Sequence, residues 1–204
     1  HLAKALLNQG FTHLPEFQNK MKAYSEGLAI AQDELTLSLL VPEIVSFLSK
    51  WVPGIPTSLL GCSSYFAWDD KTNSAIHGRV FDFPLQGSFD KNERAIWSKL
   101  DNGPATLSFS SVGFPYPSIT AMTEYGVSFA LHQKFDDVFN TKGTPIFELI
   151  YNMLQQCGDL ASTLQYLKKN ESLTTWAFYM GFKNGDVLAC DVMGKQLAYK
   201  TYKV

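Results

Sequence analysis

The sequence carries almost no net charge and contains no long apolar run. Its 17 basic and 19 acidic residues leave a formal net charge of −2, and the basic residues form no cluster along the chain. Proteins that bind nucleic acid usually present a basic patch, so we do not expect a nucleic-acid partner. We also expect no transmembrane segment, because no stretch approaches the roughly 20 apolar residues that a membrane-spanning helix needs.

Cysteine and histidine are scarce and scattered. Cys62, Cys157 and Cys190 form no Cys-x-x-Cys pair, and the four histidines form no cluster, which disfavours a zinc site. Three cysteines leave at least one thiol free, which fits either a reducing compartment or a catalytic cysteine. The chain begins at His1 rather than Met and ends at Val204 within an apparent strand. We expect a processed or cut product that lacks residues at both ends, in keeping with a secreted, periplasmic or lysosomal protein.

Aromatic residues, in contrast, are abundant. The 204 residues suffice for one domain with a substantial core, and they include 15 Phe, 9 Tyr and 4 Trp. Such side chains fill a core and also line lipophilic pockets, and their spacing does not separate the two roles. The candidates for a substrate pocket are Trp68, Phe81, Phe83, Phe114 and Tyr116.

Helical and strand-like patterns occupy different parts of the chain. Helical spacing of apolar residues predicts helices over residues 15–28, 33–40, 42–51, 145–154 and 159–167, with Asp33, Thr144 and Asp159 as caps. Strands are predicted over residues 63–68, 78–83, 107–112, 118–123, 127–134, 174–182, 187–192 and 197–202. Asn184-Gly185 is the strongest hairpin signal. Hairpins with helices segregated between them predict an α+β fold, with antiparallel sheets covered by helices on their outer faces.

The most informative pattern is a cysteine followed, one hairpin later, by an arginine and an aspartate. Arg79 and Asp82 follow Cys62 by 17 and 20 residues, across a turn-rich segment at residues 69–73. Such a hairpin would bring the three side chains close together. Cys62 is then a candidate nucleophile, Arg79 a cation able to hold a thiolate, and Asp82 an acceptor for a nearby ammonium or amide group.

These residues resemble a known family of enzymes. Gly61-Cys62 followed by Gly78-Arg79-x-Phe81-Asp82 is similar to the cysteine N-terminal-nucleophile (Ntn) hydrolases that act on linear amides. The family includes penicillin V acylases, bile salt hydrolases, acid ceramidase, N-acylethanolamine amidase and the fungal penicillin acyltransferase. Residues 15–27, 121–132 and 181–191 also resemble family segments, although Thr123 and His132 stand where the family usually has Asn.

The resemblance implies a fold and a division of the chain. We expect a four-layer αββα Ntn-hydrolase sandwich of antiparallel sheets, formed by residues 62–204 and preceded by a helical pro-region at residues 1–61. An oxyanion-hole Asn and a further Arg of the family would lie beyond Val204. The resemblance therefore implies that a missing C-terminal segment or a second chain completes the site; it does not specify an oligomeric state.

The resemblance also implies a chemistry that uses no cofactor or metal ion. Cys62 would attack the Gly61 carbonyl, and hydrolysis of the resulting thioester would release Cys62 as a new N-terminus. Its α-amino group would then act as the base for its own thiol during cleavage of a small-molecule or lipid amide with an apolar acyl group. Asp82 would hold the amine, Arg79 would stabilise the tetrahedral intermediate, and the His132 backbone N–H would donate to the oxyanion.

Four alternatives stay open at the level of the sequence. An acyltransferase of the same fold would pass the acyl group to an amine or thiol. A papain-like hydrolase would pair Cys62 with the His132 side chain, although Gly-Cys-Ser-Ser lacks the helix start that follows a papain-type cysteine. A binding module could retain the fold without the chemistry. Finally, Cys62 could be a structural thiol and Arg79–Asp82 an ordinary surface ion pair.

Overall fold

The computed structural model describes residues 15–51, 61–82, 91–99, 102–111, 117 and 119–204. Three of the candidate pocket residues, Phe83, Phe114 and Tyr116, lie outside these ranges. The described part is a mixed α+β structure with antiparallel sheets, as predicted. None of its helices is both long enough and apolar enough to cross a membrane.

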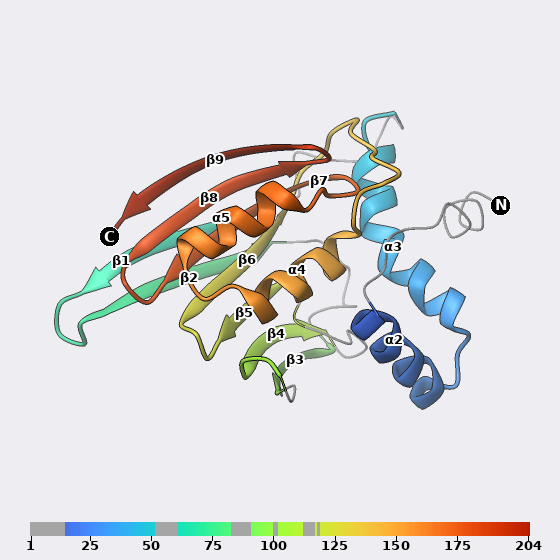
Figure 1. Cartoon of the computed structure of the whole chain (residues 1–204), viewed down its shortest axis with the longest axis horizontal. Coiled ribbons are helices and arrows are strands. Elements are labelled where there is room, and N and C mark those ends of the chain that lie inside the picture. The colour runs from blue at the N-terminus through green and yellow to red at the C-terminus, as the bar shows by residue number, and fades with distance from the viewer. Residues whose placement is uncertain (1–14, 52–60, 83–90, 100–101, 112–116, 118) are drawn as a thin grey trace.

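Seven strands form one antiparallel sheet (Figure 1). In spatial order they are β3 (Glu93–Ser98), β4 (Thr106–Ser111), β5 (Thr120–Thr123), β6 (Val127–Gln133), β7 (Thr175–Phe182), β8 (Asp186–Met193) and β9 (Gln196–Lys203). Strand β3 was not predicted. It lies at the sheet edge and begins with two charged residues, Glu93 and Arg94, and such polar edge strands lack a clear apolar alternation.

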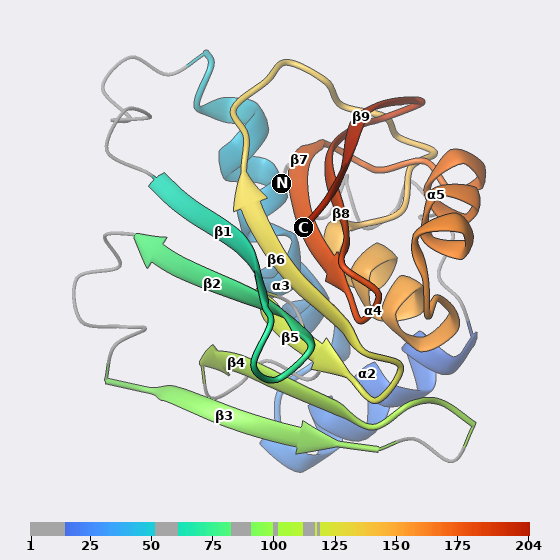
Figure 2. The same ribbon diagram turned by 90° about the vertical axis from the view of Figure 1, so that its left-hand side faces the viewer.

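A hairpin and a pair of helices cover opposite faces of this sheet. The hairpin consists of β1 (Gly61–Asp69) and β2 (Ser74–Asp82), and the helices are α4 (Ile146–Gln156) and α5 (Leu160–Lys169). Figure 2 shows the hairpin on one side of β6 and β7, with α4 and α5 on the other side. The outer face of the hairpin is exposed at Tyr65 and Val80. The fourth layer therefore stays a prediction, since no described helix covers that face.

The two faces of the central strands differ in chemistry. On the helix side, Phe129 of β6 and Phe178 of β7 are fully buried in the main core, and their rings meet edge to face at 5.2 Å. Side chains alternate between the faces of a strand, so Ser128 and His132 of β6 point toward the hairpin. A Cβ atom on Gly181 would come within 2.8 Å of the Ser128 hydroxyl oxygen. A larger residue at that position of β7 would therefore displace the Ser128 hydroxyl.

The two N-terminal helices meet the sheet at one end. Helix α2 (Pro15–Leu28) confirms the predicted segment, whereas α3 (Gln32–Leu48) is one helix that runs through Pro42. The predicted division into two helices was wrong. Proline in a helix interior costs about 3 kcal/mol, but Leu40 and Glu43 are both buried on either side of it. Tertiary packing along the whole helix therefore outweighs the local break.

Helix caps followed the prediction at one position only. Asp159 caps α5, because its carboxylate accepts the Ser162 backbone N–H at 2.7 Å. Ala31, not Asp33, is the N-cap of α3, and it makes no side-chain bond. Of the predicted Thr144-Pro145 cap of α4, Pro145 occupies the N-cap position, and no side chain forms a cap hydrogen bond there. Instead, the N–H of Ile146 in its first turn donates to the carboxylate of Glu43, which is far away in the sequence.

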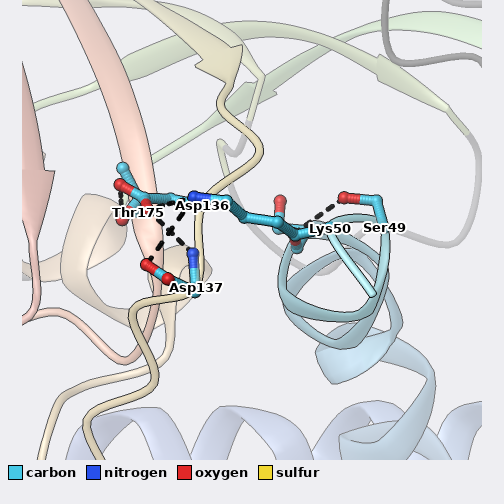
Figure 3. A network of polar contacts seen from close by, with 6 residues as sticks. Ser49, Lys50, Asp136, Asp137 and Thr175 are labelled. Carbon is cyan, nitrogen blue, oxygen red and sulfur yellow. Dashed lines mark hydrogen bonds and ion pairs between the residues drawn. The ribbon is translucent and has the colours of Figure 1, made fainter. Parts of the chain in front are cut away.

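The C-terminal end of α3 is tied to the sheet by polar contacts (Figure 3). Lys50 Nζ lies 3.5 Å from a carboxylate oxygen of Asp136 and 3.8 Å from one of Asp137. Asp136 also accepts a long, 3.5 Å hydrogen bond from the Thr175 hydroxyl of β7. These residues are partly exposed, so each ion pair contributes little.

Glu43 provides a stronger link between α3 and the rest of the molecule. Its carboxylate is almost fully buried and accepts hydrogen bonds from the Ile146 N–H, the Thr174 hydroxyl and, at 3.0 Å, the Trp176 indole N–H. Burial raises the pKa of Glu43, and these three hydrogen bonds oppose the rise. The carboxylate thereby joins α3 to α4 and β7.

We expect Glu43→Ala to lower the free energy of unfolding by about 3–5 kcal/mol, because it leaves buried donors unpaired. Urea unfolding followed by tryptophan fluorescence would measure the loss. Glu34→Ala, at an exposed position in the first turn of the same helix, is the matched control and should cost less than about 1 kcal/mol. Equal effects of the two substitutions would contradict this role of Glu43.

Candidate active site

The register of the β1–β2 hairpin decides which side chains face the large sheet. Cys62 pairs with Phe81, Ser64 with Arg79 and Phe66 with His77. Residues paired across an antiparallel ladder point to the same face. The contacts of Arg79, Ser64 and His77 with β5 and β6 identify this as the inner face. A row of polar groups beginning at Cys62 therefore lies between the hairpin and the sheet.

Arg79 connects the cysteine to the large sheet. One guanidinium nitrogen, Nη2, lies 3.5 Å from Cys62 Sγ and donates to the Leu131 carbonyl at 2.5 Å. The other, Nη1, donates to the Thr120 hydroxyl. Burial lowers the pKa of Arg79 and the adjacent Cys62 opposes that shift, but a guanidinium keeps its charge in proteins. A cation is thus held beside the sulfur by contacts to two strands.

Cys62 is the one thiol of the chain that is open to a ligand. It is half-buried and lines a cavity of about 230 Å³ together with Gly61, His132 and Tyr179, among others. Cys157 and Cys190 are buried in the core, where burial raises their pKa values to about 11 and about 12. Those two cysteines therefore remain protonated packing groups.

The structure does not bring Asp82 to the sulfur. Asp82 pairs with Gly61, it is exposed, and it follows Arg79 by three residues on a regular strand. An odd offset along a strand reverses the face, so Asp82 points away from the large sheet while Arg79 points toward it. The predicted trio is therefore a pair, Cys62 and Arg79, with Asp82 next to the Gly61–Cys62 peptide on the other face.

The two described candidate pocket residues, Phe81 and Trp68, lie at different distances from the Cys62 sulfur. The Phe81 ring, paired with Cys62, lies 5.0 Å from Cζ of Arg79 in a cation–π contact. Trp68 lies six residues along β1 from Cys62, which is roughly 20 Å in an extended strand, and it contacts the Gly185 turn. Trp68 therefore does not line a pocket with the sulfur. Its assignment to the substrate pocket stays a prediction.

A chain of hydrogen bonds that sequence reasoning missed runs beside Cys62. The Ser64 hydroxyl oxygen lies 3.1 Å from Nε2 of His132 and 3.2 Å from Nε2 of His77. Nδ1 of His77 lies 3.0 Å from the Ser128 hydroxyl oxygen. Polar residues at alternate strand positions were the available signal. Which of these polar side chains form hydrogen bonds with one another depends on how the β1–β2 hairpin crosses the large sheet. The sequence does not show this crossing.

Both histidines of this hydrogen-bond network, His77 and His132, are neutral at ordinary pH. Burial and the positive charge of Arg79 lower the pKa values of His77 and His132 to about 4. His77 and Lys134 lower that of His132 further, while a hydrogen bond to the Cys62 backbone raises it. The His132 ring also lies 4.4 Å from that of Tyr179. The imidazole of His132 thus contacts the Cys62 backbone, the Ser64 hydroxyl and the ring of Tyr179.

The position of Cys62 argues against one alternative. Cys62 stands at the beginning of β1, and the residues after it continue as a strand to Asp69. A papain-type cysteine begins a helix, whose N-terminus favours the thiolate. The cation beside this sulfur is a guanidinium instead. The arrangement therefore differs from that of a papain-like hydrolase.

Comparison with known proteins identifies the fold. No family model and no curated protein sequence matches this chain. Among solved structures, a mutant conjugated bile acid hydrolase from Clostridium perfringens matches with a TM-score of 0.50 and 14% identity, over 70% of this chain and 51% of that one. Penicillin V acylase from Agrobacterium tumefaciens matches with a TM-score of 0.50 and 13% identity, over 69% and 49%.

These likenesses define a class of fold. The chain therefore shares the fold of these two proteins over about 70% of its length. The chain spans about half the length of each of the two proteins. At this level of identity the comparison concerns the fold, and what the chain does has to be argued from its own site.

Proposed function

We propose that this chain is a self-processing cysteine amidase that hydrolyses a linear, non-peptide amide with an apolar acyl group. The observation that carries the proposal is the 3.5 Å contact between Arg79 Nη2 and Cys62 Sγ at the start of a strand. The Ntn-hydrolase fold supports it. A half-buried thiol beside a fixed cation is the environment in which a cysteine becomes a nucleophile.

Maturation comes first in this proposal. The Cys62 sulfur attacks the Gly61 carbonyl carbon, and the bond between that carbon and the Cys62 nitrogen breaks. The resulting thioester is hydrolysed by water, which gives a Gly61 carboxylate and a free Cys62 with an α-amino group. Asp82 is the strand partner of Gly61, and in this proposal its carboxylate holds the new ammonium group.

Amide hydrolysis follows the same covalent pattern. The α-amino group takes the proton of its own thiol, and the sulfur attacks the substrate carbonyl carbon. The resulting ammonium group then gives this proton to the amide nitrogen as the carbon–nitrogen bond breaks, which leaves an acyl-enzyme and the free amine. Arg79 stabilises the charge of the tetrahedral intermediate, and the backbone N–H of His132 donates to the oxyanion. Water then releases the acid. No step needs a cofactor or a metal ion.

A further polypeptide segment is proposed to complete this site. Among the described strands, β1 pairs only with β2, so its other edge offers unpaired backbone groups. Beside it is a groove of about 740 Å³, lined by Phe66 of β1 and by Tyr179, Tyr199 and Tyr202 of the sheet. A C-terminal segment or a second chain in this groove would add strands to β1 and create the four-layer sandwich, with residues 1–61 as the pro-region.

The test of the proposed function is a substrate panel for the full-length protein. The panel contains N-acyl amines, ceramide-like lipids, penicillin V and conjugated bile salts, and the free amine is quantified by mass spectrometry. We expect turnover of at least one amide with an apolar acyl group, at a rate that falls to background in the Cys62→Ala variant. Added hydroxylamine distinguishes transfer from hydrolysis, since a transferase would form the hydroxamate as its main product. A cleaved protein that hydrolyses none of these amides would contradict the proposal.

A further inference from the structure

Strand β4 has the reverse of the pattern that a strand with one buried face usually shows. Its apolar residues Leu107 and Phe109 are 37% and 44% exposed. The residues that alternate with them, Ser108 and Ser110, are almost fully buried. In most antiparallel sheets the apolar side chains face the core and the polar ones face water. Departures from such a local rule are expected at functional sites, so the exposed face of β4 is a candidate binding surface.

The two neighbouring strands extend this apolar face. Leu107 pairs with Trp97 of β3 on one side and with Met122 of β5 on the other. Side chains of paired residues point to the same face of a sheet, and both Trp97 and Met122 are more than half exposed. We call Trp97, Leu107, Phe109 and Met122 the apolar patch. Contiguous apolar surface that stays exposed is a sign of a binding site.

The apolar patch lies on the face of the sheet that carries the hairpin. Met122 pairs with Ser128 of β6, which points toward the hairpin. Phe109 pairs with Thr120 of β5, and the Thr120 hydroxyl accepts a hydrogen bond from Arg79 of β2. In Figure 2, β3 and β4 lie on the side of β2 that faces away from β1. The patch therefore lies beside the hairpin, next to its strand β2.

The path from the nucleophile to the patch is short. Arg79 lies 3.5 Å from Cys62 Sγ through Nη2 and donates to Thr120 through Nη1. The Cβ atoms of paired residues such as Thr120 and Phe109 are about 5 Å apart, so the patch begins roughly 10 Å from the sulfur. Leu107 lies two residues further along β4, which adds about 7 Å. An acyl group on the sulfur can therefore reach the patch when its chain is long.

The place of the patch indicates which molecule covers it. In the proposed function, the completing segment adds strands to β1, beside the groove lined by Tyr199 and Tyr202. The patch lies beyond β2 instead, and it continues from the Cys62–Arg79 pair. The group that the proposed reaction attaches to Cys62 is an apolar acyl group. Its chain is therefore the occupant whose chemistry and point of attachment both match the patch.

We propose that the apolar patch binds the acyl chain of the amide substrate and sets the length of chain that the protein prefers. This inference rests on the proposed function and names its substrate more closely. With its carbonyl carbon at the sulfur, the chain extends over Phe109 toward Leu107 and Trp97. A short acyl group ends before it reaches Phe109. The preferred substrate is therefore an amide with a long, linear acyl group.

The patch should act on binding rather than on the chemical step. Complete burial of a methylene group is worth about fourfold in an equilibrium constant. An open surface that covers one side of the chain should give half of that free energy, or about twofold per methylene. These contacts are equally present in the bound substrate and in the transition state, so they lower KM and leave kcat unchanged. A rise in kcat/KM with acyl length that comes from KM is the kinetic signature expected of the patch.

The experiment measures kcat and KM of the mature full-length protein for amides of one amine with butanoyl, octanoyl and dodecanoyl groups. For the wild type, kcat/KM should rise by at least about 100-fold from the butanoyl to the dodecanoyl amide. Phe109→Ser and Leu107→Ser should each lower this ratio by about tenfold, through KM. Phe109→Leu keeps an apolar side chain and should lower it by less than about threefold. Ile76→Ser is the matched control, because Ile76 is 46% exposed on the outer face of the hairpin, and it should leave the ratio unchanged.

Three results would overturn the inference and leave the proposed function in place. The first is hydrolysis of the butanoyl amide or of penicillin V at a kcat/KM equal to or above that of the dodecanoyl amide. The second is a wild-type ratio in Phe109→Ser, or a ratio that falls in Tyr199→Ser instead, which would place the chain in the groove. The third is a wild-type dimer that dissociates in Trp97→Ser with an unchanged ratio, which would assign the patch to a second copy of the chain. A cleaved protein that hydrolyses no amide at all would instead overturn the proposed function.

Discussion

Replacement of Cys62 by alanine is expected to abolish both self-cleavage after Gly61 and amide hydrolysis. The other two thiols, Cys157 and Cys190, are buried in the core with raised pKa values, so neither can substitute for it. Loss of a covalent nucleophile in a hydrolase costs up to about 10⁶ in rate, and we expect a fall of at least about 10⁴-fold. A chase on denaturing gels measures cleavage, and amine release measures hydrolysis.

Cys157→Ala is the control for this experiment. It removes a buried thiol from the same protein, so it should lower the free energy of unfolding by roughly 1–2 kcal/mol through the cavity that it leaves. It should not change the chemistry of the folded fraction. If the Cys62→Ala chain still cleaved itself at the same bond, the sulfur of Cys62 would not be the nucleophile and the proposed mechanism would fail.

The second large effect is expected at Arg79. Arg79→Met removes the cation beside the sulfur and should slow cleavage and hydrolysis by about 10²–10³-fold, the range found when one stabilising donor of an oxyanion site is lost. It also removes the donors to Thr120 and to the Leu131 carbonyl. Arg79→Lys keeps the charge but cannot reach these acceptors and the sulfur together. Its rate should therefore lie between those of the wild type and Arg79→Met.

Arg94 is the only other arginine of the chain and provides the control. It is exposed on β3, where it donates to the Glu93 carbonyl. Arg94→Met should leave both rates within about twofold of wild type. A folded Arg79→Met protein with wild-type rates would show that the contact with Cys62 has no catalytic consequence.

Local signals in the sequence predicted most of the elements. The Asp159 cap and the Asn184-Gly185 turn act through neighbouring residues, and both α5 and the β7–β8 hairpin formed as expected. The continuous helix α3 was not predictable from its Pro42, because the stabilising contacts come from Ile146, Thr174 and Trp176. Elements with a strong local pattern could be found from the sequence, whereas the weakly patterned strand β3 and the contacts between distant residues could not.

The same distinction applies to the candidate site. The spacing between Cys62 and Arg79 predicted their proximity, because a single hairpin connects them. The placement of Asp82 depended on the exact ladder, in which an odd offset from Arg79 reverses the face. The chain from His77 to His132 joins residues of separate strands through Ser64. Only the crossing of the hairpin over β6 brings those groups together.

The most direct test of the account is the intact mass of the purified full-length protein under denaturing conditions. Self-processing predicts two polypeptides instead of one. The mass of the first corresponds to a chain that ends at Gly61, and the mass of the second to a chain that begins at Cys62. A single uncut chain that persists after prolonged incubation at neutral pH would contradict the central claim, which is that the sulfur of Cys62 releases its own amino group.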